Sequence, residues 1–205
     1  MGYKFAEIAF TPTIRVLQEQ DGSREIYARM EQSEEERRYQ LTAREAEFIA
    51  QRDSFYMATV SETGWPMIQH RGGETGFLKV LGEQHIGFAD YAGNRQFISI
   101  GNLQNNDRVA LFLMSYPEKR RLKILGRVTL LAPDDTRWMP ELCRDIGDKP
   151  VQRGLLIQVE AFDWNCPQHI TPRFSDAELN QRIQVLEQEN RTLRAQLRTQ
   201  GQEPV

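Results

Sequence analysis

The sequence is poor in cysteine: its 205 residues include only Cys143 and Cys166. These two lie in unlike contexts and form no C-x-x-C pair, so we expect no disulfide framework. A reducing, cytoplasmic environment is the expectation that follows. Cys166 and His169 have the C-x-x-H spacing of half a zinc site. No second pair stands at a suitable distance along the chain, so simple packing is the favoured interpretation and we expect no metal site.

Long apolar runs and a basic surplus are also missing. No run approaches the roughly 18 residues of a membrane-spanning helix, and the first ten residues lack the regions of a signal peptide. The formal net charge of −3 argues against a nucleic-acid-binding protein, which usually carries a basic surplus on one face. We therefore expect neither a membrane nor nucleic acid as a partner. Serine-hydrolase, zinc-protease and P-loop motifs are absent as well.

The first 53 residues are predicted to be helical. Pro12 follows Thr11 as a first-turn proline, and Gly22 is a helix stop signal. Thr42 and Glu45 have the spacing of a capping box ahead of the helix AREAEFIAQRD. This segment is interpreted as scaffold rather than as a site.

Residues 54–172 change to the period of two that is typical of strands. FYMATV and MIQH flank the turn SETGWP and predict a hairpin, and VALFLM is continuously apolar, which is typical of a strand covered on both faces. Helical spacing occurs in Phe97, Ile100 and Leu103, and again over residues 133–147. The pattern predicts an α+β protein, mainly β, with six or seven strands in a closed or nearly closed antiparallel barrel.

The segment 173–205 carries a heptad pattern. The seam consists of Leu179, Leu186 and Leu193 at d positions and of Ile183, Asn190 and Leu197 at a positions. A lone Asn at an a position fixes the register of two-stranded parallel coiled coils. Packing of this stripe on the barrel is the alternative. We favour a coiled-coil helix that supports a homodimer.

Three cations lie at or beside predicted strand ends. Arg71 precedes two glycines that would let the backbone approach a ligand, Lys79 lies in the next strand, and Arg95 is predicted at the start of a helix. Each one alone is typical of a solvated surface charge. Their recurrence at the strand ends of a small barrel suits the binding of a phosphate-bearing cofactor.

The order of these segments resembles the flavin-binding split-barrel family, whose best-known members are the pyridoxamine 5′-phosphate oxidases. Arg71 with Lys79, FADYAGNRQ, QNNDRVALFLMSY and RRLKILGRV carry the resemblance over about residues 54–131, with a weaker match at 154–164. It implies a six- to seven-stranded antiparallel split barrel that holds FMN, or a deazaflavin or other flavin, at a homodimer interface. It also implies an oxidoreductase acting on an unidentified small molecule. The implied cofactor contacts are Arg71, Lys79, Asp90, Tyr91, Asn94, Arg95, Gln96, Lys123, Trp164 and Gln168.

Two features depart from the family pattern. Gln96 stands where many members have a second cation, and the C-terminal segment WNCPQHITPRF lacks the Arg and His motif with which the oxidases contact substrate. The chain therefore resembles a branch separate from the true oxidases, and no catalytic residue is assigned. Trp164 is interpreted either as stacking beside the flavin ring or as a buried tryptophan. The alternative functions are a non-catalytic flavin-binding or sensing module and a cofactor-free structural dimer.

Overall fold

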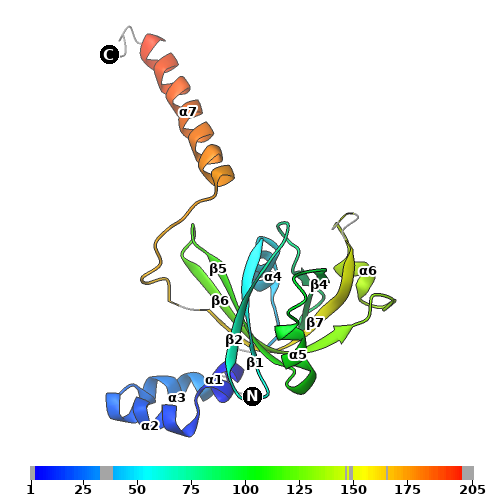
Figure 1. The fold of residues 1–205 in the computed structure, drawn as a ribbon. Helices are drawn as coiled ribbons and strands as arrows, with labels where there is room; N and C mark the ends of the chain where they lie inside the picture. Colours follow the sequence, from blue (N-terminus) through cyan, green and yellow to red (C-terminus); the bar gives the residue numbers. More distant parts are fainter. Residues whose placement is uncertain (1–2, 33–38, 146, 148–149, 165, 200–205) are drawn as a thin grey trace. The chain divides into compact units, whose positions relative to one another are not determined.

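The structure is a computed structural model that describes residues 3–32, 39–145, 147, 150–164 and 166–199 (Figure 1). The chain divides into two compact units, one made of residues 1–115 and 120–167 and the other of residues 116–119 and 168–205. The segment boundaries at residues 53 and 172 divide the chain by sequence pattern, and they stay a prediction.

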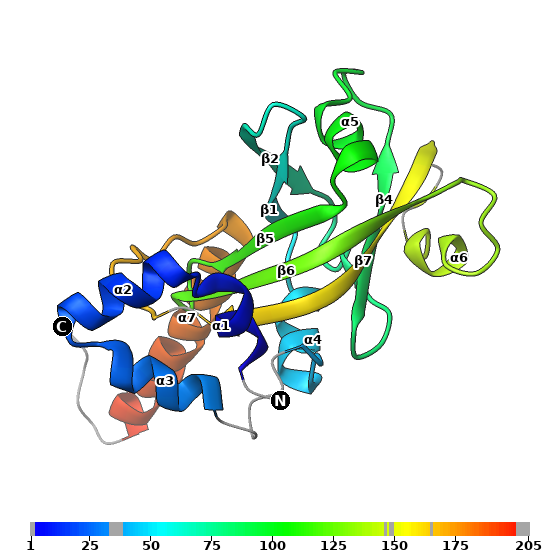
Figure 2. The ribbon, with the colours of Figure 1, turned by 90° about the horizontal axis from the view of Figure 1, so that it is seen from below.

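A seven-stranded antiparallel sheet forms the centre of the first unit. Its strands are β1 Ser54–Val60, β2 Pro66–Gly72, β3 Lys79–Val80, β4 His85–Tyr91, β5 Arg108–Ser115, β6 Arg120–Leu131 and β7 Val151–Trp164. Their order in space is β2-β1-β5-β6-β7-β4-β3, and every neighbouring pair is antiparallel. The sheet curls on itself (Figures 1 and 2), which confirms the predicted α+β class and the seven-stranded split barrel.

Alternation along the strands places the core inside this curled sheet. In β6, Leu122 and Ile124 are fully buried, whereas Lys123 between them lies on the outer face. The inner face carries the largest fully buried side chains of the sheet, which are Phe55, Met57, Ile86, Leu111, Leu113, Leu122, Ile124 and Leu155. Burial of apolar surface on one face of each strand is the main stabilising contribution to such a fold.

One strand differs from its predicted environment. VALFLM forms most of β5, and Val109, Leu111 and Leu113 are buried, but Ala110 is exposed and Phe112 is half-buried. The prediction that both faces of this strand are covered is therefore wrong for the single chain. Among the described residues, the outer face of β5 is only partly covered, which leaves apolar side chains accessible.

The helices are α1 Lys4–Ala9, α2 Pro12–Asp21, α3 Arg24–Gln32, α4 Ala43–Ala50, α5 Ile98–Asn105, α6 Met139–Leu142 and α7 Asp176–Thr199. The capping box of α4 forms as predicted, with the Thr42 backbone N–H donating to Glu45 Oε2 at 3.1 Å. Gly22 ends α2 in the left-handed conformation. None of the described helices combines the length and apolarity that a membrane span requires.

The helix predicted over residues 133–147 is much shorter than expected. Asp135 Oδ1 accepts hydrogen bonds from the backbone N–H groups of Arg137 and Trp138, at 3.0 and 2.7 Å. This turn holds the chain out of a helix until Met139, and the left-handed backbone of Asp145 is incompatible with continuation. Only the single turn α6 forms between them.

Candidate functional site

A cavity of about 120 Å³ lies where the split of the barrel is bridged by side chains. It is lined by Gln69, Arg71, Asp90, Tyr91, Gln152, Arg153 and residues 93–100. Asp90 and Arg153 meet because β4 and β7 pair there in register. Arg71 comes from β2, which is at the opposite edge of the strand order, so its contact with Asp90 spans the split.

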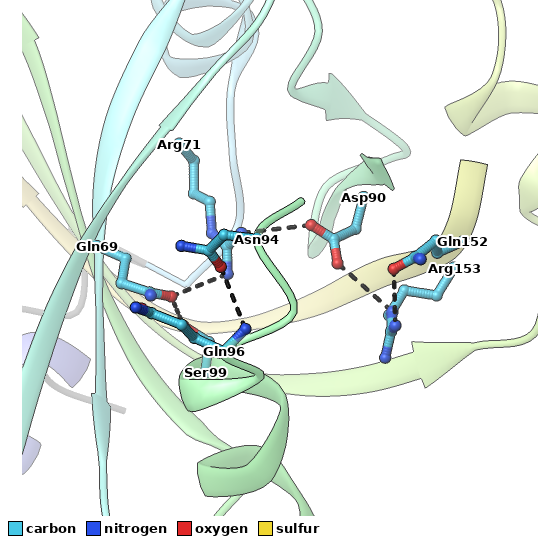
Figure 3. A network of polar contacts seen from close by, with 8 residues as sticks. All are labelled: Gln69, Arg71, Asp90, Asn94, Gln96, Ser99, Gln152 and Arg153. Carbon is cyan, nitrogen blue, oxygen red and sulfur yellow. Dashed lines mark hydrogen bonds and ion pairs between the residues drawn. The ribbon is translucent and has the colours of Figure 1, made fainter. Parts of the chain in front are cut away.

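Asp90 is the centre of a polar network (Figure 3). Arg71 Nη1 donates to Asp90 Oδ1 at 3.3 Å, and Arg153 Nε lies 3.4 Å from Asp90 Oδ2. Arg71 Nη2 also donates to Gln69 Oε1 at 3.3 Å, and the Ser99 hydroxyl donates to the same oxygen. One carboxylate therefore lies between two guanidinium groups, and neutral side chains hold the first of these in place.

The network is largely withdrawn from water. The side chains of Arg71, Asp90 and Arg153 are 19%, 16% and 21% exposed. Burial lowers the pKa of Arg71, and the nearby Asp90 carboxylate opposes that change. The Nε atoms of Arg71 and Arg153 are buried, and neither has a hydrogen-bond partner among the described residues.

The cavity has an excess of positive charge. Arg71, Arg95 and Arg153 line it together with the single carboxylate of Asp90, so three positive charges and one negative charge leave an excess of two. Buried polar groups without partners are costly. An anion with several oxygens, such as a phosphate group, would satisfy the charge and accept these hydrogen bonds.

The loop before α5 differs from the prediction in a way that matters for this cavity. The Asn94 side chain accepts a hydrogen bond from the Gln96 backbone N–H at 3.2 Å, and Arg95 and Phe97 have φ values of 59° and 54°. Helix α5 begins only at Ile98, so the prediction that Arg95 starts the helix is wrong. Phe97, which was predicted to lie on the helix's apolar face, is exposed. The left-handed backbone turns Arg95 and the helix start toward the same cavity.

The first turn of α5 adds backbone donors to the site. Ile98, Ser99 and Ile100 line the cavity, and the N–H groups of a helix's first turn have no partner within the helix. These N–H groups lie at the positive end of the helix dipole, and that end of a helix attracts an anion.

Six of the ten predicted contacts line this cavity: Arg71, Asp90, Tyr91, Asn94, Arg95 and Gln96. Lys79 does not; it lines a separate cavity of about 550 Å³ and pairs with Asp145 at 3.6 Å. Tyr91 lines both cavities, so the two are neighbours. Gln168 lies in an exposed turn of the second unit.

Lys123 and Trp164 lie elsewhere in the first unit. Lys123 pairs with Asp163 at 3.0 Å, and its Nζ lies 4.5 Å from the centre of the Phe5 ring. Trp164 Nε1 donates to Glu45 Oε1 at 2.7 Å. The guanidinium groups of Arg44 and Arg120 lie 4.7 and 4.5 Å from the centre of the Trp164 ring. These contacts match the interpretation of Trp164 as a packed structural tryptophan rather than as a flavin-stacking one.

Sequence reasoning missed four polar side chains of the cavity: Gln69, Ser99, Gln152 and Arg153. Gln69 had a usable signal, because it lies two residues before Arg71 and therefore on the same strand face. Arg153 had none, because its position follows from the pairing of β4 with β7 across more than fifty residues of chain. Among the described residues, no group of three or more potential metal ligands occurs.

Asp90→Asn tests how the cavity balances its charge. Without the carboxylate, two buried guanidinium groups face each other, so we expect the free energy of unfolding to fall by about 1–3 kcal/mol. Added phosphate should then stabilise the variant more than the wild type, because the competing negative charge is gone. Thermal unfolding with and without phosphate measures both effects. Asp107→Asn is the control, since Asp107 pairs with Arg127 at 2.8 Å on the surface; equal phosphate responses in all three proteins would contradict the assignment.

The fold and the site together define a split-barrel protein with a positively charged cavity in the split. The family model described as pyridoxamine 5′-phosphate oxidase matches residues 41–158, which is more than half of the chain and includes every residue that lines the cavity. The chain belongs to this family. No curated protein matches the sequence.

Several solved structures are similar in fold. HupZ of Group A Streptococcus has 13% identity and a TM-score of 0.49, with 65% of this chain and 99% of that chain covered. An FMN-binding protein from Syntrophomonas wolfei has 12% identity and a TM-score of 0.48, with 72% and 97% covered. A protein related to general stress protein 26, from Clostridium acetobutylicum, has 17% identity and a TM-score of 0.42, with 64% and 92% covered.

Proposed function

We propose that this protein is an FMN-binding oxidoreductase that acts on a small molecule and functions as a homodimer. The observation that carries the proposal is the cavity in the split, where the Nε–H groups of Arg71 and Arg153 are buried and make no hydrogen bond to the described residues, although Arg153 Nε lies 3.4 Å from Asp90 Oδ2. Family membership and an excess of two positive charges point to the same ligand chemistry, a phosphate monoester.

The residues present fit the phosphate end of FMN. Arg71, Arg153 and Arg95 would bind the phosphate oxygens together with the first-turn N–H groups of α5. The cavity of about 120 Å³ is well below the roughly 300–1,000 Å³ that encloses a whole small molecule. The flavin ring therefore has to lie outside this cavity. A deazaflavin that carries a phosphate at the same place would make the same contacts.

When bound, the flavin supplies hydride and electron transfer, and the protein supplies position and electrostatics. Asp90 keeps Arg71 and Arg153 oriented before the phosphate arrives, which lowers the cost of ordering them on binding. Gln69 and Ser99 fix the Arg71 guanidinium from the other side.

The cavity beside Lys79 supports a small-molecule partner. Its volume of about 550 Å³ lies within the range that encloses a whole ligand. Phe77, Leu78 and Val80 give it apolar walls, and Lys79 provides a cation whose side chain is 18% exposed. Because Tyr91 lines both this cavity and the anion cavity, a substrate there would be close to whatever the anion cavity holds.

The outer face of the sheet supports the homodimer. Tyr56, Ile68 and Ala110 are exposed there and lie on adjacent strands, since Tyr56 is paired with Phe112 and Ala58 with both Ile68 and Ala110. A contiguous exposed apolar patch marks an interaction surface. A second copy of the chain would cover it and would account for the continuously apolar sequence of β5.

The decisive experiment identifies the small molecule that the purified protein releases on denaturation. We expect FMN, or a phosphorylated deazaflavin, at close to one molecule per chain by mass spectrometry and absorbance. Turnover with a reduced nicotinamide donor and an electron acceptor then separates an oxidoreductase from a flavin-binding sensor. Light scattering of the native purified protein tests the homodimer. A colourless protein that also fails to take up added FMN would favour the cofactor-free structural dimer and reject the proposal.

A further inference from the structure

Helix α7 has an apolar seam that the described residues of its own unit leave exposed. Leu179, Ile183, Leu186 and Leu193 are 42%, 51%, 57% and 57% exposed, although they all lie on one helix face. An isolated helix of 24 residues gains little stability from backbone hydrogen bonds alone. A seam of period 3.5 is the pattern that packs against an identical seam.

The charged residues beside the seam identify the partner. With Ile183 and Asn190 at a positions, Arg182 and Glu189 occupy g positions, and Glu187 and Arg194 occupy e positions. In a parallel, in-register pair, each g residue faces the e residue five positions later on the other helix. Arg182 then faces Glu187 of the second copy, and Glu189 faces Arg194. Both kinds of contact join opposite charges, and each occurs twice by symmetry.

The polar layer favours the same orientation. In a parallel pair, Asn190 meets Asn190 of the second copy, and the two amides can hydrogen-bond to each other. In an antiparallel pair an a residue faces d residues, so Asn190 would be buried against leucine without a partner. Ile183 at a, with Leu186 and Leu193 at d, is the combination that favours two strands rather than three or four.

We propose that α7 of two copies of this chain forms a parallel, in-register, two-stranded coiled coil, with the Arg182–Glu187 and Glu189–Arg194 contacts selecting the partner. This interface lies outside the barrel and does not depend on the proposed flavin site. It gives the protein a second dimer contact, one that discriminates between partner chains by their tail charges.

A charge swap in the full-length protein tests which partner is selected. Arg182→Glu with Arg194→Glu makes every charged e and g residue acidic, whereas Glu187→Arg with Glu189→Arg makes them all basic. Each variant repels itself and attracts the other. When the two are co-expressed with different tags, mixed dimers should exceed either pure dimer by more than about tenfold, against about twofold for two wild-type chains. Mixed dimers at the wild-type proportion would overturn the proposal.

Cross-linking tests the orientation. In a background of Cys143→Ser and Cys166→Ser, Leu179→Cys places thiols opposite each other near the start of a parallel pair. Gln181→Cys, at an f position on the outer face, is the matched control. We expect oxidation to link the Leu179→Cys chains and not the Gln181→Cys chains. Equal linking of both, or selective pairing without a link at position 179, would overturn the parallel arrangement. Flavin content should equal that of the wild type in every variant, so loss of flavin reports on the barrel and not on the tail.

Discussion

Arg71→Ala is expected to lower the affinity for FMN by roughly ten- to a hundredfold. The substitution removes a charge-assisted contact to a phosphate dianion in a site largely withdrawn from water, a loss of about 1.5–3 kcal/mol. It also releases Asp90 and Gln69, which the Arg71 guanidinium contacts at 3.3 Å each, so the cavity loses both charge and shape. Titration of the flavin-free protein with FMN, followed by flavin fluorescence, measures the affinity directly.

Two further variants separate this effect from a general loss of charge. Arg127→Ala removes an arginine that pairs with Asp107 and Glu160 at 2.8 and 3.2 Å and is 42% exposed, so FMN affinity should stay at the wild-type value. Arg71→Lys keeps the charge but loses the planar fork, and we expect an intermediate affinity. If Arg71→Ala and Arg127→Ala bind FMN equally well, the phosphate is held elsewhere.

Much of the fold followed from the sequence where the signal was local, although the helix predicted over residues 133–147 shortened to the single turn α6. The alternation around Lys123, the hairpin after Phe55 and the Thr42–Glu45 capping box each depend on residues within a few positions of one another. The same holds for the part of the site that one short segment carries, namely residues 90–96. Local patterns are read reliably because strand period and turn chemistry are set by neighbouring residues.

The rest of the site depends on contacts between distant segments and on one local turn before α5. Arg153 reaches Asp90 through strand pairing, and Arg71 reaches it across the split. Arg95 was expected at a helix start, but a side-chain turn at Asn94 and a left-handed backbone displace the helix by three residues. Neither kind of information is present in residue spacing alone. Polar residues that gather only in the folded state are the ones that single-sequence reasoning omits.

The site also explains why the barrel can remain split. No strand pairing among the described residues joins β2 to β4, and Arg71 connects them through its contact with Asp90 and its position 5.9 Å from the centre of the Phe88 ring. A bridge made of charged side chains is weaker than a hydrogen-bonded ladder, and it leaves a polar cavity. An anion bound there would contact both sides of the split. We therefore expect the ligand to stabilise the barrel in proportion to its affinity.

Glu45→Ala is expected to cost more stability than any other single carboxylate substitution proposed for this protein. Glu45 is 3% exposed, and it accepts hydrogen bonds from the Thr42 backbone N–H at 3.1 Å, the Thr42 hydroxyl and Trp164 Nε1 at 2.7 Å. Truncation removes the α4 capping box and leaves the indole N–H without an acceptor. The expected loss is about 2–4 kcal/mol in the free energy of unfolding, or roughly 4–16 °C in melting temperature. Glu47→Ala, an exposed residue on the same helix, should change the free energy by less than about 0.5 kcal/mol.

The Glu45 carboxylate should also make stability depend on pH. Burial alone would raise the pKa of Glu45, but hydrogen bonds from Thr42 and Trp164 outweigh burial, so its pKa lies below the ordinary value. The folded state therefore binds this proton less readily than the unfolded chain does. The stabilisation is fully present above the ordinary glutamate pKa and is lost as the pH falls through the lowered one. Glu45→Gln keeps the shape but does not titrate, so denaturant unfolding should show the difference between wild type and Glu45→Gln shrinking as the pH falls through that window. A difference that stays constant from neutral to acidic pH would mean that Glu45 is not held ionised by these contacts.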